Sequence, residues 1–460
     1  MTHGTRISRN ISVPALARVE GEGGLEIIVE NGEVAEARLD IYEPPRFFEA
    51  LLRGRRYTEP PDITARICGI CPVAYQMSAC QAIEDACQAS VTQEISALRR
   101  LLYCGEWIES HALHVYLLHA PDFLGYASGI DLARDHPDIV GRGLRIKKAG
   151  NRLMEVIGGR SVHPVNVKVG GFYKAPAPAE LAALVPALDQ ARRDAADTVE
   201  WVAGFDFPDF DRDYEFVALR HPAQYPITAG RVVSSTGLDI TPAEYDSHFT
   251  EFQVPHSTAL HSVLDGRTYL TGPLARYSLN SGRLPPAIRQ AAAAAGLQAT
   301  CTNPFRSIIV RAVELLFACD EALRLIHRYQ PPDPPAVDVR PVPRTERTER
   351  TERTEGTATG YGCTEAPRGL LYHRYTITGD GTIADAKIVP PTSQNQRAIE
   401  ADLKDFAATR LDLEHEKLTS ECEQAVRNHD PCISCAAHFL NLRVAQAHRQ
   451  GTSKAQAQGR

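Results

Sequence analysis

The sequence lacks the features that mark several specialised classes of protein. It contains no run of about eighteen apolar residues, so we expect no membrane span. The segment from Met1 to Pro14 has charge and serine but no apolar core, which argues against a signal peptide. The formal net charge is -7, whereas nucleic-acid binding needs a concentrated basic surface. These absences exclude nucleic acid as a partner and favour a cytoplasmic protein.

Common cofactor motifs are also missing. No G-x-G-x-x-G follows a predicted strand, so the sequence has no recognisable dinucleotide-binding motif. No G-x-x-x-x-G-K-[ST] occurs either, so it has no recognisable motif for binding a nucleoside triphosphate. Apart from two C-x-x-C pairs, no closely spaced cysteines are available for iron–sulfur clusters. Any redox chemistry of this chain would therefore need a second polypeptide to carry electrons.

The remaining composition is that of a globular protein with a large core. The chain has 460 residues, 43% of them hydrophobic and 23% charged. Leu25–Val29 and Val34–Ile41 flank Asn31-Gly32, a strong two-residue turn, and so predict a β-hairpin. Apolar spacing predicts a long helix from 94 to 119 and further helices over much of the remaining chain. We therefore expect an α+β fold that is predominantly helical, with a small N-terminal β-sheet. The other predicted helices are 144–157, 178–203, 286–296, 305–328, 396–410 and 415–427, and the other strands are 165–169, 215–219 and 372–377.

Two stretches differ from this pattern. Residues 330–358 open with a proline-rich run and then repeat Arg-Thr-Glu four times, which predicts a charged low-complexity insertion loop. The chain beyond His438 ends in a polar tail. We expect one catalytic domain over 1–438 and a separate tail over 439–460.

Four of the eleven cysteines form two C-x-x-C pairs, Cys68 with Cys71 and Cys432 with Cys435. This spacing lets both sulfurs of a pair face one ion, and thiolates suit zinc, iron–sulfur, nickel or copper. A structural zinc site is the main alternative, although its two pairs usually lie closer along the chain. A pair of local redox motifs is a weaker one, because no thioredoxin-like βαβ pattern surrounds them. The other seven are interpreted as buried small hydrophobes.

The amino-acid sequence around these cysteines resembles that of the large subunit of nickel–iron hydrogenases. R-x-C-G-x-C at Arg66–Cys71 and D-P-C-x-x-C-x-x-H at Asp430–His438 match the two signatures of that family. The resemblance spans most of the chain and implies the family's fold, and CPVAYQMSA is most similar to the cytosolic NAD(P)-linked branch. Further elements match in order: Arg18-Val19-Glu20-Gly21, Pro45–Glu49, Gly158–Gly171, Glu365–Gly369 and Pro390–Asn395.

Two positions depart from the family pattern. The family often has histidine four residues after the second cysteine of the first pair, where this chain has Tyr75. It also often has histidine directly after R-V-E-G, where this chain has Glu22. Neither position is a direct metal ligand in the family. Tyr75 can still donate a hydrogen bond towards a sulfur or a carboxylate.

The resemblance implies a role for each matched residue. Cys68, Cys71, Cys432 and Cys435 would bind nickel, with Cys71 and Cys435 bridging to an iron that carries carbon monoxide and cyanide. Glu20 would take a proton from the Cys432 side, and Arg368 would point its guanidinium over the metal pair. Pro391 and Thr392 would line the pocket of the iron ligands. Glu49 and His438 would bind magnesium.

The resemblance also implies the activity and the partners. The chain would catalyse reversible heterolytic cleavage of dihydrogen and pass electrons to an iron–sulfur small subunit and a flavin-containing module that reduces NAD(P). A maturation endopeptidase would cut after His438 and remove Phe439 to Arg460. Three alternatives stay open: a hydrogen sensor with low turnover, a non-enzymatic protein with a zinc clasp, and a fold relative that lost its metal. Retention of all four cysteines argues against the last, and Glu20 and Arg368 argue against the clasp.

Overall fold

The computed structural model describes residues 9–44, 47–341 and 356–437. The Arg-Thr-Glu repeat, Pro45-Arg46, His438 and the tail lie outside these ranges, so the predictions made for them stay predictions. No helix within the described ranges is long and apolar enough to cross a membrane.

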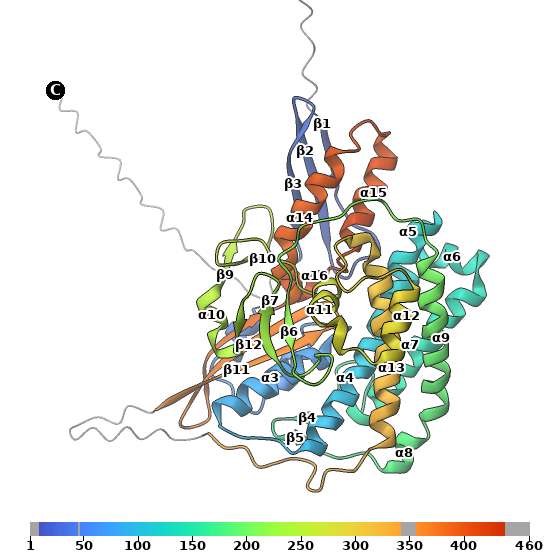
Figure 1. Cartoon of the computed structure of the whole chain (residues 1–460). Helices are drawn as coiled ribbons and strands as arrows, with labels where there is room; N and C mark the ends of the chain where they lie inside the picture. The colour runs from blue at the N-terminus through green and yellow to red at the C-terminus, as the bar shows by residue number, and fades with distance from the viewer. Residues whose placement is uncertain (1–8, 45–46, 342–355, 438–460) are drawn as a thin grey trace, which may run out of the picture.

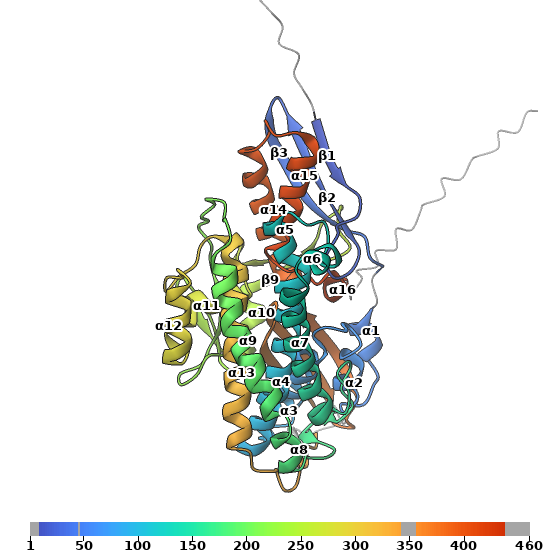
Figure 2. The same cartoon turned by 90° about the vertical axis from the view of Figure 1, so that its right-hand side faces the viewer.

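The largest layer is a bundle of four long helices, α4 (Gln93–Leu113), α7 (Pro137–Gly158), α9 (Val185–Ala203) and α13 (Ser307–His327) (Figure 1). The turned view shows these helices running side by side (Figure 2). Helix α4 starts where the Thr92 hydroxyl accepts a hydrogen bond from the backbone N–H of Ile95, which caps the helix. Two glycines let α4 and α7 approach closely: a Cβ on Gly150 would lie 2.7 Å from the carbonyl oxygen of Gly105.

Small antiparallel sheets surround this bundle. β1 (Arg9–Val13), β2 (Gly23–Glu30) and β3 (Glu33–Ile41) form the N-terminal sheet, and the predicted hairpin is its β2–β3 pair. β11 (Thr357–Ala366), β12 (Gly369–Thr378) and β13 (Ile383–Val389) form a second sheet against α3 (Pro72–Ala86). The predicted α+β class with mostly helical content is therefore confirmed.

The core is divided between these layers. The larger apolar cluster fills the bundle and the space between α3 and the β11–β13 sheet. A second cluster packs β1–β3 against α14 (Pro391–Ala408) and α15 (His415–Arg427). The four cysteines lie where these two layers meet, since their sulfurs join the loop before α3 to the short helix α16 (Ile433–Ala436).

The other elements are short and complete the frame. The helices are α1 (Phe48–Leu52), α2 (Pro60–Thr64), a π-helix (His114–His119), α5 (Ala120–Leu124), α6 (Gly129–Asp135), α8 (Pro178–Ala182), a 3-10 turn (Pro242–Glu244), α10 (Tyr245–His248), α11 (Pro273–Asn280), a 3-10 turn (Ser281–Arg283), α12 (Pro286–Ala294) and a 3-10 turn (Pro304–Arg306). The strands are β4 (Val167–Lys168), β5 (Gly171–Phe172), β6 (Val217–Arg220), β7 (Arg231–Ser234), β8 (Asp239–Ile240), β9 (Phe249–Gln253) and β10 (Leu260–Leu264).

Most predicted helices occur, with shifted ends. The helix predicted over 144–157 begins at Pro137, and the one predicted over 396–410 begins at Pro391. The helix predicted over 94–119 changes to π geometry at His114. The predicted strands at 165–169, 215–219 and 372–377 lie at β4, β6 and β12.

Candidate metal centre

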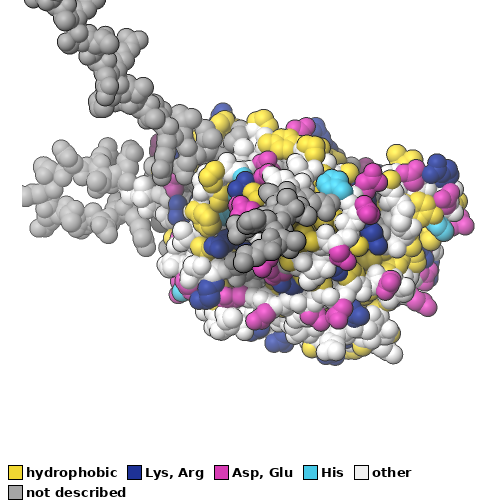
Figure 3. Space-filling model, turned by 90° about the horizontal axis from the view of Figure 1, so that it is seen from above, with side chains coloured by type: hydrophobic (Ala, Val, Ile, Leu, Met, Phe, Trp, Pro, Cys, Tyr) yellow, Lys and Arg dark blue, Asp and Glu magenta, His cyan; other side chains and the backbone are white. Residues whose placement is uncertain are grey.

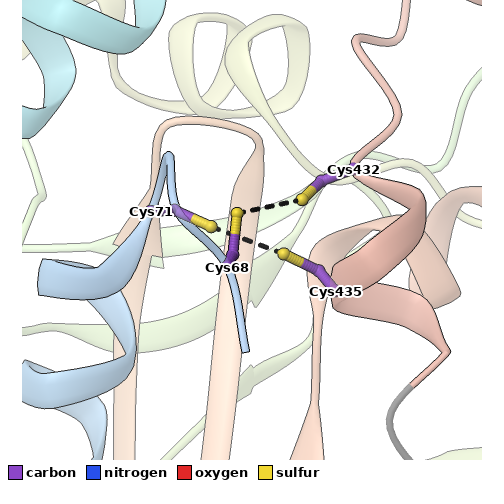
Figure 4. Close-up of side chains that lie close together, drawn as sticks. All are labelled: Cys68, Cys71, Cys432 and Cys435. Atoms are coloured by element: carbon purple, nitrogen blue, oxygen red, sulfur yellow. Dashed lines mark hydrogen bonds between the residues drawn. The ribbon is translucent and has the colours of Figure 1, made fainter. Parts of the chain in front are cut away.

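Four thiol side chains converge at one buried point. The Sγ atoms of Cys68 and Cys432 are 3.4 Å apart, and those of Cys71 and Cys435 are also 3.4 Å apart (Figure 4). All four sulfurs lie within 4.8 Å of one another, and every one of these residues is buried. The two pairs therefore come together as one group that could hold a metal ion.

The first pair is held by the start of α3. Pro72 occupies the first turn of the helix, where a missing N–H costs nothing. The Glu106 carboxylate, from α4, accepts hydrogen bonds from the N–H groups of Val73 (2.6 Å) and Ala74 (3.1 Å). The loop that carries Cys71 is thus fixed to the helical bundle.

The second pair is held by the N-terminal segment. Glu20 and Cys432 form a parallel β-bridge, and the N–H of Ile433 donates to the carbonyl of Glu20 at 2.9 Å. Gly21 follows with φ +90°, and a Cβ there would lie 2.7 Å from both Ile433 Cβ and a Glu43 carboxylate oxygen. This close approach explains why glycine follows Glu20.

The Glu20 side chain contacts the site directly. Its Oε2 accepts from the Cys432 thiol at 3.0 Å and from the N–H of Ser434 at 3.1 Å. Burial raises the pKa of this carboxyl, and the neighbouring Cys68 adds to the effect. The Ser434 hydroxyl donates to Glu43 at 3.0 Å, which leads from the buried site towards a partly exposed carboxylate.

Arg368 lies in the tight turn between β11 and β12 and is 2% exposed. Its Nε donates to the carbonyl of Asp430 at 2.9 Å, and its Nη2 donates to the Asp430 carboxylate at 3.0 Å. Its pKa is raised well above the ordinary value, because the charges of Asp430 and of Cys432, Cys71 and Cys68 outweigh burial. The Arg368 guanidinium is therefore held by Asp430, two residues before Cys432.

The thiols share protons unequally. A hydrogen bond from Cys432 is the main cause that holds the pKa of Cys68 well below its ordinary value. Burial holds the pKa of Cys432 well above it.

The donor set fits a cationic group that also carries anionic ligands. Four sulfurs are soft ligands suited to nickel or iron. Two buried polar atoms beside them, Arg368 Nη1 and Asp430 Oδ2, make no hydrogen bond to any described residue. Such atoms are costly to leave unpaired, so they indicate a missing polar partner.

The remaining predicted residues lie around this centre in different ways. Thr392 Oγ1 accepts from the N–H of Cys432 at 2.9 Å, and Pro391 is buried beside it at the start of α14. Glu49 Oε1 accepts from the N–H of Ile388, on β13, at 2.7 Å. Tyr75 is 1% exposed, and its pKa is raised by burial and by the charges of the nearby cysteines.

Sequence reasoning missed Asp430, Ser434 and Glu43. Asp430 was part of a recognised motif, but only the fold pairs it with Arg368, 62 positions away. His111 lies at the end of α4, and His114 and His119 lie in the π-helix that follows. All three are buried packing residues: His119 Nε2 contacts Asn428 Oδ1 at 2.9 Å, and His111 Nε2 lies 3.1 Å from Glu314.

The comparisons with known proteins agree with this site. The family model described as nickel-dependent hydrogenase matches residues 46–135 and 262–438, which include all four cysteines. The chain therefore belongs to the family of nickel-dependent hydrogenase large subunits. Within it, the chain is 33% identical to sulfhydrogenase 1 subunit alpha of Pyrococcus furiosus, over 94% of this chain and 98% of that one.

Two further similarities concern NAD-reducing enzymes. The chain is 25% identical to the NAD-reducing hydrogenase HoxS subunit beta of Cupriavidus necator, over 94% of this chain and 96% of that one. A crystal structure of an NAD+-reducing [NiFe]-hydrogenase in the H2-reduced state superposes with a TM-score of 0.81 and 26% identity, over 94% of this chain and 100% of that one. The protein is thus the catalytic large subunit of a nickel–iron hydrogenase.

Proposed function

We propose that this subunit cleaves dihydrogen reversibly and heterolytically, and that its electrons pass through an iron–sulfur subunit to a flavin-containing module that reduces NAD(P). The observation that carries the proposal is the convergence of four buried sulfurs with Glu20 on one of them and Arg368 held by Asp430, two residues before Cys432. When bound, a nickel–iron group with carbon monoxide and cyanide on iron supplies the Lewis acidity that polarises dihydrogen.

Cys68, Cys71, Cys432 and Cys435 would hold the metals, since their four sulfurs lie within 4.8 Å of one another. Glu20 would accept the proton from Cys432, because its Oε2 already accepts that thiol's hydrogen bond. The proton would then leave towards Glu43, whose carboxylate accepts from the Ser434 hydroxyl at 3.0 Å, beside the Ser434 N–H that donates to Glu20.

Arg368 would bind the anionic ligands of iron with the Nη1 that has no partner among the described residues. The Thr392 hydroxyl, whose oxygen already accepts from the N–H of Cys432, would donate a hydrogen bond to the same ligands. Pro391 would exclude water beside them. These contacts orient the group and keep its surroundings dry.

Glu49 and His438 would bind magnesium. Support comes from Glu49, whose carboxylate holds the backbone of β13 at Ile388. The same His438 would mark the cut that a maturation endopeptidase makes, releasing Phe439–Arg460. An intact mass of the nickel-loaded subunit should be lower by that segment, and a full-length mass would contradict the cleavage.

An apolar surface beside the first cysteine pair supports an iron–sulfur partner. Val162, Val165 and Tyr173 are 47%, 38% and 66% exposed, and Val162 lies 4.0 Å from the position of a Cβ on Gly69, between the two cysteines. On the face shown in Figure 3, basic and acidic side chains are interspersed. An iron–sulfur subunit bound to this apolar patch would hold its clusters a short distance from the cysteines, so that electrons could pass between them.

The acceptor is tested with the complex purified from its native host. We expect hydrogen-dependent reduction of NAD+ or NADP+, at a rate comparable with reduction of an artificial dye. Dye reduction without reduction of either nucleotide would overturn the NAD(P) assignment and leave the hydrogenase. Turnover near zero with both acceptors, in a complex that holds nickel, would favour the hydrogen-sensing alternative.

A further inference from the structure

A second group of ligand-type side chains converges far from the cysteines along the chain. His256, His261 and Glu400 place their ligand atoms within 4.8 Å of one another. Within the described ranges, this triad and the four cysteines are the groups of three or more such side chains that come this close. Nothing in the proposed mechanism uses the triad.

The three side chains come from separate elements. His256 lies in the loop after β9, His261 lies on β10, and Glu400 lies on α14, which packs against both β10 and β3 (Figure 1). His256 Nε2 is 2.7 Å from Glu400 Oε1, and His261 Nε2 is 3.1 Å from Glu400 Oε2. The two rings are 5.7 Å apart at an angle of 84°, so each nitrogen approaches the carboxylate from a different side.

The surroundings hold the carboxylate in place. The N–H of Leu39, on β3, donates to Glu400 Oε1 at 3.0 Å. Carboxylates that bind metals are commonly fixed by such an additional hydrogen bond. His261 is 1% exposed, and its Nδ1 has no hydrogen-bond partner among the described residues. The nitrogen of this ring that faces Glu400 is Nε2, so Nε2 is the atom available to an ion in the triad.

The site is reachable from solvent. The side chains of His256 and Glu400 are 19% and 16% exposed, whereas that of His261 is 2% exposed. The nearby Glu36 is already engaged by Arg38, at 2.8 Å and 2.6 Å. A water molecule is thus the natural fourth ligand of an ion held by the triad.

We propose that His256, His261 and Glu400 bind a zinc-class divalent ion. Two imidazoles and one carboxylate are an established zinc ligand set, with metal–ligand distances of about 2.0–2.2 Å. Tetrahedral geometry then separates ligand atoms by about 3.3–3.6 Å, so His256 Nε2, now 2.7 Å from Glu400 Oε1, would move away from it by about 0.6–0.9 Å, and the two imidazole nitrogens, which lie within 4.8 Å of each other, would close on one ion. On binding, each imidazole would present its Nε2 lone pair to the ion, and the proton that joins Nε2 to Glu400 would move to Nδ1 or leave to solvent.

The ion would act as a clamp. It would tie β10 and the loop after β9 to α14, whose first turn carries the Thr392 hydroxyl that accepts from Cys432. The site holds no redox-active side chain, and its role is to fix α14 rather than to transfer electrons. A hydrogen-bonded triad without an ion is the competing interpretation.

The test uses the nickel-loaded holoenzyme, in which the four cysteines are occupied. The enzyme is treated with EDTA, equilibrated with zinc chloride, desalted, and analysed for zinc and nickel. We expect about one more zinc per nickel in wild type than in His256→Ala, and a rise in Tm on adding zinc in wild type but not in His256→Ala. The matched control is His248→Ala, because His248 is a partly exposed histidine that pairs with Asp265 instead, and it should behave as wild type.

Equal zinc content in wild type and His256→Ala would overturn the proposal and leave a hydrogen-bonded triad. Glu400→Gln serves as a second variant, since it keeps the shape of the side chain and removes the charged ligand. It should weaken zinc binding by at least about tenfold, and unchanged binding would also overturn the proposal. Partner subunits contribute equally to every sample, so the difference between variants reports this site alone.

Discussion

Two buried clusters of charged side chains lie close together in this fold and differ in one respect. Around Arg276 every donor is used: its guanidinium bonds Glu314 at 2.7 Å, Glu365 at 2.8 Å, and the carbonyls of Ala366 and Pro367. Around Arg368, Nη1 and the Oδ2 of its partner Asp430 have no partner among the described residues. In the first cluster protein groups satisfy every donor of the arginine, whereas the second cluster needs a ligand to satisfy its remaining polar atoms.

This difference distinguishes a cluster that stabilises the fold from a cluster that takes part in the chemistry. Both arginines are buried and both pair with carboxylates, so burial and charge do not distinguish them. What distinguishes them is whether the polar atoms are satisfied, since an unpaired buried group costs about 1–3 kcal/mol. Changes at the first cluster should therefore act on stability, and changes at the second on activity.

The largest effect is expected from Cys432→Ser. It should abolish nickel binding and lower dihydrogen turnover by more than about a thousandfold, because a thiolate ligand is lost. Nickel content and dihydrogen-dependent dye reduction are the measurements. Cys422→Ser is the control, since Cys422 is equally buried on α15 and lies outside the centre. Full turnover in Cys432→Ser would disprove the ligand assignment.

Glu20→Gln should lower turnover by about a hundredfold to a thousandfold with nickel content unchanged, since positioned acid–base groups typically contribute that much. The neighbouring Glu22→Gln should have little effect, because Glu22 is exposed and its side chain does not contact Cys432 in the structure. The rate of isotope exchange between deuterium gas and water is the direct measurement. If Glu20→Gln exchanges as fast as wild type, the proton leaves by another route.

A matched pair of arginine substitutions tests the comparison itself. Arg368→Lys keeps the positive charge but loses the planar, forked set of guanidinium N–H donors. We therefore expect a loss of activity of about tenfold to a hundredfold with little change in Tm. Arg276→Lys should instead lower the free energy of unfolding by about 2–3 kcal/mol, because several charge-assisted hydrogen bonds are lost. The folded fraction of Arg276→Lys should keep its activity per nickel. The opposite assignment of effects would refute the distinction between the clusters.

The smallest effect concerns pH. Burial opposes ionisation of Glu314, but Arg276 outweighs it and lowers the pKa of Glu314 from 4.5 to about 2. A carboxyl with a lowered pKa stabilises the fold above its unfolded pKa and loses that contribution as pH falls towards about 2. The stability difference between wild type and Glu314→Gln should shrink by about 1 kcal/mol between pH 7 and pH 4. Urea unfolding at the two pH values measures it, and a constant difference would contradict the ion pair.

The sequence predicted the elements whose cause is local. Asn31-Gly32 predicts the β2–β3 hairpin, and the two C-x-x-C pairs with their flanking motifs predict the ligand set. The start of α7 was predicted too late, because Gly141 and Gly143 weaken the helical pattern. Gly143 is explained only by the fold, since a Cβ there would lie 2.4 Å from the Tyr116 ring. Contacts between distant segments, such as Arg368 with Asp430, have no local cause and so could not be predicted.

The metal centre joins the two ends of the chain, and this imposes an order of events on synthesis. Cys68 and Cys432 are 364 positions apart, and Glu20 is further still from Cys432. At about 5–20 residues per second, roughly 20–70 seconds pass between translation of the first cysteine pair and the second. A chain that stops before Cys432 holds only two of the four sulfurs, so the full set cannot bind a metal until translation has passed Cys435.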